Sequence, residues 1–140
     1  SHKFTDNDPD RSHPAPNREE KNQMIKIEAI VRPERVNLVL IALEEAGCTG
    51  YHLFNITGAG QQRGVEVFTG RGAGTVVRTA LPKTLIITVV ADGMKDTVIQ
   101  AILGVARSGE EGAIGDGKIF ISAIDDVVRV RTGESGDVAL

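Results

Sequence analysis

Glycine and cationic residues that could bind phosphate gather in residues 112–131. A glycine-rich turn, Gly115-Asp116-Gly117, leads directly into Lys118, and Arg129 and Arg131 follow two residues apart. Glycine lets a backbone approach a phosphate closely, and successive N–H groups in such a turn form an anion-binding nest. If the arginine segment is extended, both guanidinium groups leave the same face, and such groups suit phosphate oxygens. The segment therefore predicts a site for the phosphates of a nucleotide.

The same stretch nearly matches a Walker A motif, because residues 112–118 read G-x-x-x-x-G-K. That motif requires Ser or Thr next, to hold Mg²⁺, and a helix whose N-terminus faces the phosphates. Here Ile119 follows, and residues 119–124 alternate with the period of two that is typical of a strand. We therefore reject the P-loop and keep two hypotheses, a phosphate-binding turn or a purely structural turn with Lys118 in solvent.

The composition is that of an ordinary globular domain, with 41% apolar and 25% charged residues in 140. A net charge of -3 and an aromatic content of 4% argue against nucleic-acid binding. No apolar run approaches the roughly 18 residues of a membrane span, and the N-terminus shows no signal-peptide pattern. With Cys48 as the single cysteine, a cytoplasmic protein without membrane insertion is expected.

Residues 1–23 are rich in proline and charge, and we expect a disordered tail before a folded domain at 24–140. In that domain we expect strands at 24–32, 51–57, 84–91 and 119–124, and helices at 33–46 and 94–107. A glycine-rich loop is expected from 58 to about 80, and the long flexible loop of the domain is placed at about 60–81. This order predicts an α+β, ferredoxin-like βαββαβ sandwich.

The two expected helices carry apolar stripes and should cover one face of the sheet. The stripes are Val36, Leu40, Leu43 and Ala46 in the first helix, and Met94, Val98, Ile102 and Val105 in the second. The other face still shows Ile30, Phe54, Ile56 and Val90, or their neighbours. Self-association is the economical way to cover such a face.

Five segments resemble the PII family of signalling proteins, in the family's order and spacing: IKIEAIVRPERV, GAGQQRG, LPK, IGDGKIFISAI and RVRTGESGDVAL. The resemblance covers essentially all of residues 24–140 and implies a homotrimer that binds ATP or ADP in clefts between subunits. It implies nucleotide contacts at Ile30, His52, Gly58, Gly60, Val89, Gly115, Asp116, Gly117, Lys118, Arg129 and Arg131. His52 stands where many members have Thr, which puts the contact there in doubt.

The resemblance also implies a second effector beside the nucleotide, at Gln62, Arg63, Gly64 and Lys83. The matching Gln of relatives helps to hold Mg²⁺ with ATP and 2-oxoglutarate, so Gln62 is the expected metal ligand. The matching Lys pairs with the oxoacid. Both roles suit the chemistry, because an amide oxygen is a fair ligand for a hard cation and an ammonium is a natural carboxylate partner.

Two loops depart from the family pattern. The loop VEVFTGRGAGTVVRTA aligns with the mobile T-loop that contacts target proteins, but it contains no Tyr for modification. The segment SGEEGAIG is longer than in relatives, and its acids Glu110 and Glu111 would weaken a triphosphate relative to ADP or AMP if they lie near the phosphates. These departures suggest a divergent branch such as the carboxysome-associated type, so bicarbonate and 2-oxoglutarate both remain as candidate co-effectors.

Three classes of function remain open. The chain is expected to be a non-enzymatic regulator that responds to small molecules and contacts an unidentified target protein through its T-loop. A slow ATPase is one alternative, although Asp116 fits a turn hydrogen bond better than a catalytic base. A metal-binding trimer similar to the CutA group is another, although Lys118, Arg129 and Arg131 in one cleft would repel a metal.

Overall fold

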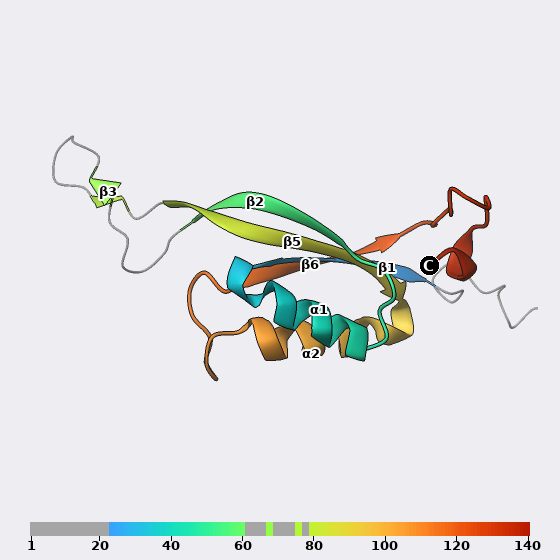
Figure 1. Ribbon diagram of the computed structural model, residues 1–140, viewed down its shortest axis with the longest axis horizontal. Helices are drawn as coiled ribbons and strands as arrows, with labels where there is room; N and C mark the ends of the chain where they lie inside the picture. The colour runs from blue at the N-terminus through green and yellow to red at the C-terminus, as the bar shows by residue number, and fades with distance from the viewer. Residues whose placement is uncertain (1–22, 61–66, 69–74, 77–78) are drawn as a thin grey trace, which may run out of the picture.

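The computed structural model describes residues 23–60, 67–68, 75–76 and 79–140 (Figure 1). Its elements are β1 (Met24–Val31), a 3-10 turn (Pro33–Arg35), α1 (Val36–Glu45), β2 (His52–Gly60), β3 (Val67–Phe68), β4 (Thr75–Val76), β5 (Thr79–Ala91), a second 3-10 turn (Asp92–Met94), α2 (Lys95–Ala106), β6 (Gly117–Ile124) and a third 3-10 turn (Gly136–Ala139). β1, β2, β5 and β6 form one antiparallel sheet in the order β2-β5-β1-β6. The predicted ferredoxin-like α+β fold is confirmed. The predictions for residues 1–22 and for Gln62, Arg63 and Gly64 lie outside the described residues.

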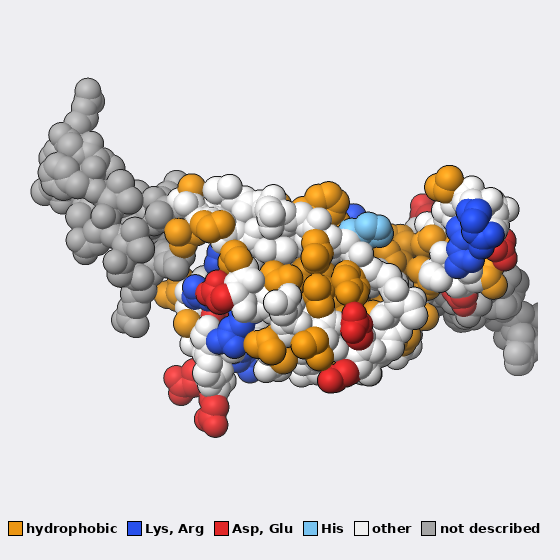
Figure 2. Space-filling view, in the orientation of Figure 1, with side chains coloured by type: hydrophobic (Ala, Val, Ile, Leu, Met, Phe, Trp, Pro, Cys, Tyr) orange, Lys and Arg blue, Asp and Glu red, His pale blue; other side chains and the backbone are white. Residues whose placement is uncertain are grey.

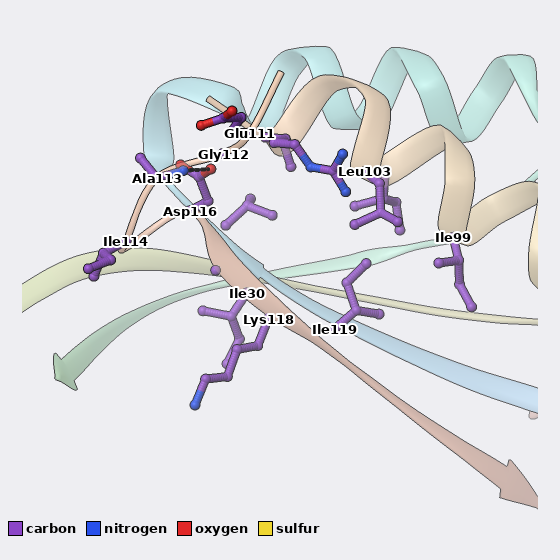
Figure 3. Close-up of a pocket in the computed structure, with 15 residues that line it drawn as sticks. Ile30, Ile99, Leu103, Glu111, Gly112, Ala113, Ile114, Asp116, Lys118 and Ile119 are labelled. Atoms are coloured by element: carbon purple, nitrogen blue, oxygen red, sulfur yellow. Dashed lines mark hydrogen bonds between the residues drawn. The ribbon is translucent and has the colours of Figure 1, made fainter. Parts of the chain in front are cut away.

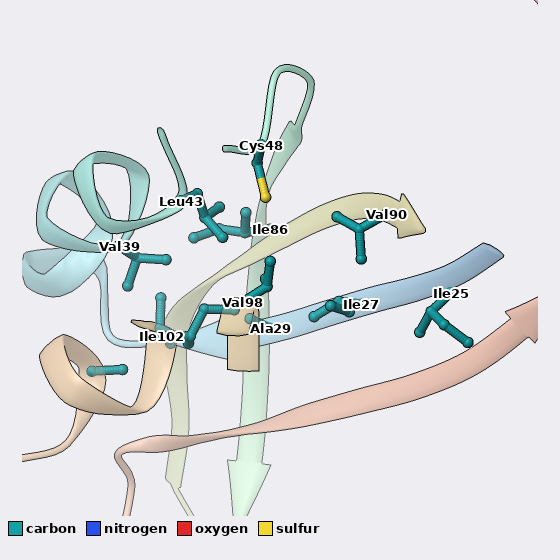
Figure 4. Packing of buried hydrophobic residues seen from close by; sticks show 12 residues of the cluster. Ile25, Ile27, Ala29, Val39, Leu43, Cys48, Ile86, Val90, Val98 and Ile102 are labelled. Atoms are coloured by element: carbon teal, nitrogen blue, oxygen red, sulfur yellow. The ribbon is translucent and has the colours of Figure 1, made fainter. Parts of the chain in front are cut away.

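The core forms where both helices pack on one face of the sheet (Figure 4). β1 lies between β5 and β6, and its alternate residues Ile25, Ile27, Ala29 and Val31 are buried under the helices. Leu43, Val98 and Ile102 of the predicted stripes are also buried. The other residues of the two predicted stripes are half-buried at the margin of the core, because Val39, Ala42 and Ala106 occupy the inner positions of the helices.

The structure decides two features of the predicted sheet. Val90 belongs to the buried core, with 3% of its surface exposed, and its neighbour Val89 lies on the open face. The predicted loop at 58–80 also began too early and ended too late, since β2 and β5 stay paired out to Gly60 and Thr79. The glycines there do not end the strand because cross-strand hydrogen bonds hold them in register.

The sheet has a face without helices and two edges without partners among the described strands. Phe54 and Phe120 on that face are each 51% exposed, and Ile30 and Ile56 are half-buried. β2 and β6 are the edges. In the described part of the chain, neither helix has the length and apolar character needed to cross a membrane.

Candidate functional site

The glycine turn lies between α2 and β6 and is organised by one carboxylate. Asp116 Oδ2 accepts hydrogen bonds from the backbone N–H groups of Ser108 and Ala113, both at 2.8 Å. Its Oδ1 accepts from Ser108 Oγ at 2.6 Å and from Arg32 Nε at 3.2 Å. Arg32 also donates from Nη2 to the carbonyl of Ile114 at 3.0 Å. These bonds tie the turn to the end of β1 and to the residues that follow α2.

The carboxylate of Asp116 is held in its charged form. Partial burial by itself would raise its pKa, but the hydrogen bonds from Ser108, Ala113 and Arg32 outweigh this effect and hold the pKa well below its usual range. A carboxylate saturated by donors on its own chain has little capacity left for catalysis. The structure therefore gives the Asp116 side chain the turn-forming role weighed in the sequence, while its backbone belongs to the predicted phosphate loop.

Gly117 lies where no other residue fits. Its φ is +121°, and a Cβ atom there would come within 1.8 Å of the carbonyl oxygen of Ile30 on the neighbouring strand. β6 can therefore pair closely with β1 from its first residue, which places Lys118 opposite Ile30. Because Lys118 lies in a strand and not at the start of a helix, the rejection of the P-loop is confirmed.

Lys83 of β5, two strands away from β6, reaches the same turn. Its ammonium donates to the carbonyl of Gly115, and its side chain passes 3.3 Å from the position of a Cβ atom on Gly58. Desolvation lowers the pKa of Lys83, helped by the positive charge of Arg32, while Glu34 and Asp116 oppose the shift. Lys83 and Arg32 thus place two cations close to the carboxylates of Asp116 and Glu34.

An apolar cavity of about 640 Å³ opens beside the turn (Figure 3). Ile99 and Leu103 of α2 project toward Ile119 of β6, and these three side chains form what we call the cavity floor. Its lining also includes Ile30, Glu111, Gly112, Asp116, Gly117 and Lys118. Ile30 and Lys118 point away from the floor, toward the open face of the sheet (Figure 3).

The structure brings together only part of the predicted nucleotide site. Ile30, Gly58 and residues 115–118 meet at one end of the sheet together with Lys83, and Gly60 follows on β2. Val89 pairs with Lys26, and His52 pairs with Ile87 and is exposed, both farther along the sheet. Gln62, Arg63 and Gly64 are outside the described residues.

Arg129 and Arg131 lie beyond the opposite end of β6 from Lys118 (Figure 1). A strand of this length separates its ends by about 24 Å, so the three cations do not share a cleft within one chain. The arginine segment is also not extended, because Gly133 N donates to Arg129 O at 2.8 Å and closes a turn that contains Arg131. The expectation of two guanidinium groups on one strand face is therefore wrong for the single chain.

Sequence reasoning missed two residues of the site, Arg32 and Ser108. Arg32 is in the quoted segment IKIEAIVRPERV, but its partner Asp116 is 84 positions away. Ser108 follows α2 directly, where a short polar side chain often bonds to nearby backbone. Among the described residues, no group of three or more His, Cys, Asp or Glu is placed to hold a metal ion.

The fold and this glycine turn define a ferredoxin-like protein with a carboxylate-organised glycine turn between its second helix and its last long strand. The family model of nitrogen regulatory protein P-II matches residues 24–134, and the chain belongs to this family. Nitrogen regulatory protein P-II 2 of Methanothermobacter thermautotrophicus is 48% identical over 84% of this chain and 97% of its own length. Nitrogen regulatory protein P-II of Rhodobacter capsulatus is 45% identical over 84% of this chain and all of its own.

Solved structures agree with this assignment. B. subtilis GlnK, also solved as a complex with ATP, superimposes with a TM-score of 0.67 in both structures, at 29% and 28% identity. The two matches cover 84% of this chain and 99% and 98% of GlnK. Arabidopsis thaliana PII bound to citrate superimposes with a TM-score of 0.65 at 35% identity, over 85% of this chain and 94% of its own.

Proposed function

We propose that this chain is a regulatory protein that binds an adenine nucleotide, with the phosphates on residues 115–118. The observation that carries the proposal is the turn itself. Asp116 organises the turn, Gly117 brings it close to β1, and it leads into Lys118, whose ammonium has no hydrogen-bond or ion-pair partner within the described residues. A free ammonium beside exposed backbone is suited to a phosphate group. The ATP complex of the relative GlnK supports adenine nucleotide as the ligand.

The nucleotide site is completed in this proposal by a second copy of the chain. Arg129 and Arg131 are too far from Lys118 to reach the same phosphates within one chain, because β6 lies between them. A second copy, in the homotrimer that the family resemblance implies, supplies them. The open sheet face with Phe54 and Phe120 exposed gives a physical reason for association.

A small anion is the proposed co-effector, and Lys83 is its anchor among the described residues. The ammonium of Lys83 lies at the turn beside the guanidinium of Arg32, and Asp116 already pairs with Arg32. The citrate complex of the relative from Arabidopsis supports a carboxylate ligand. Two candidates follow from the sequence, 2-oxoglutarate with Mg²⁺ at Gln62 and bicarbonate, and calorimetric titration with each in the presence of ATP, ADP or AMP distinguishes them.

Signalling is proposed to pass from this site to a target protein through residues 61–80. Lys83 and Gly58 lie at the base of that segment, on β5 and β2, and both contact the site region. Membership of the P-II family favours such a regulator over the slow ATPase and CutA-like alternatives. Ligand binding would then act by shifting populations of the segment toward the form that the target recognises.

Changing Lys118 to Ala tests the nucleotide site. Loss of a hydrogen bond to a charged group costs about 1.5–3 kcal/mol, so affinity for ATP measured by calorimetry should fall roughly 10-fold or more. Lys95→Ala, in the first turn of α2, is a control that should leave affinity unchanged. Equal affinity of the Lys118→Ala variant and the parent would show that the phosphates do not bind at this turn.

A further inference from the structure

Two large apolar side chains are exposed on the outer surface of α1. Leu38 is 45% exposed and Ile41 is 52% exposed, whereas Val39 and Leu43 of the same helix are buried in the core. Residues three apart are neighbours on a helix surface, so Leu38 and Ile41 form one apolar strip. Single exposed apolar residues are common on proteins, and the surroundings of the strip therefore decide whether it is a docking surface.

The strip borders α2, which lies beside α1 and runs antiparallel to it (Figure 1). Arg35, just before α1, donates from Nη1 to the carbonyl of Val105 near the end of α2 at 3.5 Å. At the other end of α1, a Cβ atom on Gly47 would lie 3.3 Å from Cε of Met94, just before α2. Leu38 is three residues after Arg35 and therefore lies on the flank of α1 that faces α2.

Gly104 leaves the backbone of α2 uncovered on this surface. It is an exposed residue inside a helix, where glycine is less favourable than alanine. A Cβ atom there would meet nothing within 4 Å, and its φ is not positive, so the described chain does not require glycine. Close approach of another backbone is a physical reason for glycine at such a position. We call Leu38, Ile41, Gly104 and the neighbouring Ala101 the helical patch.

Carboxylates flank the apolar strip at both ends. Glu34 is four residues before Leu38 and Glu45 is four residues after Ile41, and both are exposed. Figure 2 shows hydrophobic side chains over α1 and acidic side chains toward both of its ends. The last turn of α1 also contains Glu44 and no basic residue, although the helix dipole disfavours negative charge there. The surface is therefore complementary to basic residues.

We infer that the helical patch docks an amphipathic helix of a partner protein. Its apolar residues pack on Leu38 and Ile41, its backbone approaches α2 at Gly104, and a Lys or Arg at each end pairs with Glu34 and Glu45. A second copy of this chain is disfavoured, because the same carboxylates would face one another. The patch is separate from residues 115–118, so the inference does not rest on the proposed nucleotide site.

A synthetic peptide with the complementary pattern is the probe. The peptide is a helix of about 18 residues with the pattern K-x3-L-x2-L-x3-K on an Ala and Gln background, and its control has Glu in place of both Lys. Fluorescence anisotropy with the full chain should give a Kd at least about tenfold lower for the Lys peptide. Equal affinities, or no saturable binding of the Lys peptide, overturn the inference.

Variants of the patch separate docking from stability. Gly104→Gln places a side chain in open space and improves the helix, so the urea midpoint should not fall, whereas affinity for the Lys peptide should drop at least about fivefold. Ile41→Ser should lower this affinity about tenfold. Glu45→Lys should also lower it, and Glu110→Lys, with the same change of net charge in the loop before β6, should not. Unchanged affinity of Gly104→Gln contradicts docking over α2.

Three other occupants are distinguished by further measurements. Sedimentation velocity identifies a second copy if Ile41→Ser reduces the assembly of the parent. A rise in affinity for the Lys peptide after deletion of residues 1–22 identifies that segment as the occupant. Cosedimentation of the parent, but not of Ile41→Ser, with phosphatidylcholine vesicles identifies a membrane surface. Each of these results overturns the assignment to a partner helix.

Discussion

Replacing Asp116 with Ala should destabilise the turn and the fold around it. The substitution removes the acceptor of four hydrogen bonds, two from backbone N–H groups and two from the side chains of Ser108 and Arg32. Each hydrogen bond contributes about 1 kcal/mol net to stability. Because water replaces part of the lost bonding at a half-buried site, the free energy of unfolding should fall by about 3 kcal/mol. Urea unfolding at one fixed protein concentration measures it, since assembly also contributes to stability.

The pH dependence of this loss follows from the lowered pKa of Asp116. A carboxyl group whose pKa is lower in the folded state stabilises the fold fully above its unfolded pKa, near 3.9, and loses that contribution as pH falls through the folded value. The difference between the parent and Asp116→Ala should therefore be constant from about pH 8 to pH 5 and shrink below about pH 4.

A control in the same loop separates the role of Asp116 from a general effect of charge. Glu110 is exposed and has no hydrogen-bond or ion-pair partner in the described part of the chain, so Glu110→Ala should change the free energy of unfolding by less than about 0.5 kcal/mol. If Asp116→Ala is equally mild, the carboxylate does not organise the turn, and the physical basis of the proposed phosphate site is wrong.

Three further outcomes are expected. Gly117→Ala should cost about 3 kcal/mol or more in urea unfolding because of its positive φ and its contact with β1, whereas Gly104→Ala, in an open helical position, should be neutral or stabilising by up to about 1 kcal/mol. Glu134→Gln removes an ion pair of 3.8 Å from Arg129 and should raise ATP affinity in calorimetry by up to about 5-fold; a decrease contradicts a phosphate role for that arginine. Deleting residues 65–79 should keep ATP affinity within a few-fold and abolish pull-down of the target protein, and loss of ATP binding would instead make that loop part of the pocket.

The strands and helices could be predicted because burial leaves a period in the sequence. Ile25, Ile27 and Ala29 alternate with polar residues since only one face of β1 is covered by helices. Gly47 marks the end of α1 with a φ of +97°, which is the conformation that glycine favours after a helix. These signals are local, so the chain shows them without its tertiary structure.

Other features of the fold depend on partners distant in sequence. Val89 and Val90 are equally apolar, and a slip of one residue along a strand exchanges the buried and open faces, so the sequence could not rank them. Pairing between β2 and β5 extends both strands to Gly60 and Thr79. The local glycine content indicated a loop there instead.

The candidate site was predictable in its residue types and not in its arrangement. The turn 115–118 was found from its glycines and lysine, but the bonds from Arg32 and Ser108 to Asp116 leave no periodic trace. The spacing of Arg129 and Arg131 suggested a common strand face, whereas hydrogen bonds to Gly133 and Glu134 bend this segment into a hairpin. Distances along the chain therefore identified the cations without showing that they lie at opposite ends of β6.

The hydrogen bond from Lys83 to the carbonyl of Gly115 connects the glycine turn directly to β5, which pairs with the edge strand β2. Lys83 lies on β5 opposite Ile56, four residues past Thr79, where the paired part of the β2–β5 ribbon ends. An anion that binds the Lys83 ammonium, as proposed, would compete with the Gly115 carbonyl for this donor. Anion binding and the link between the turn and β5 would then be coupled through one side chain.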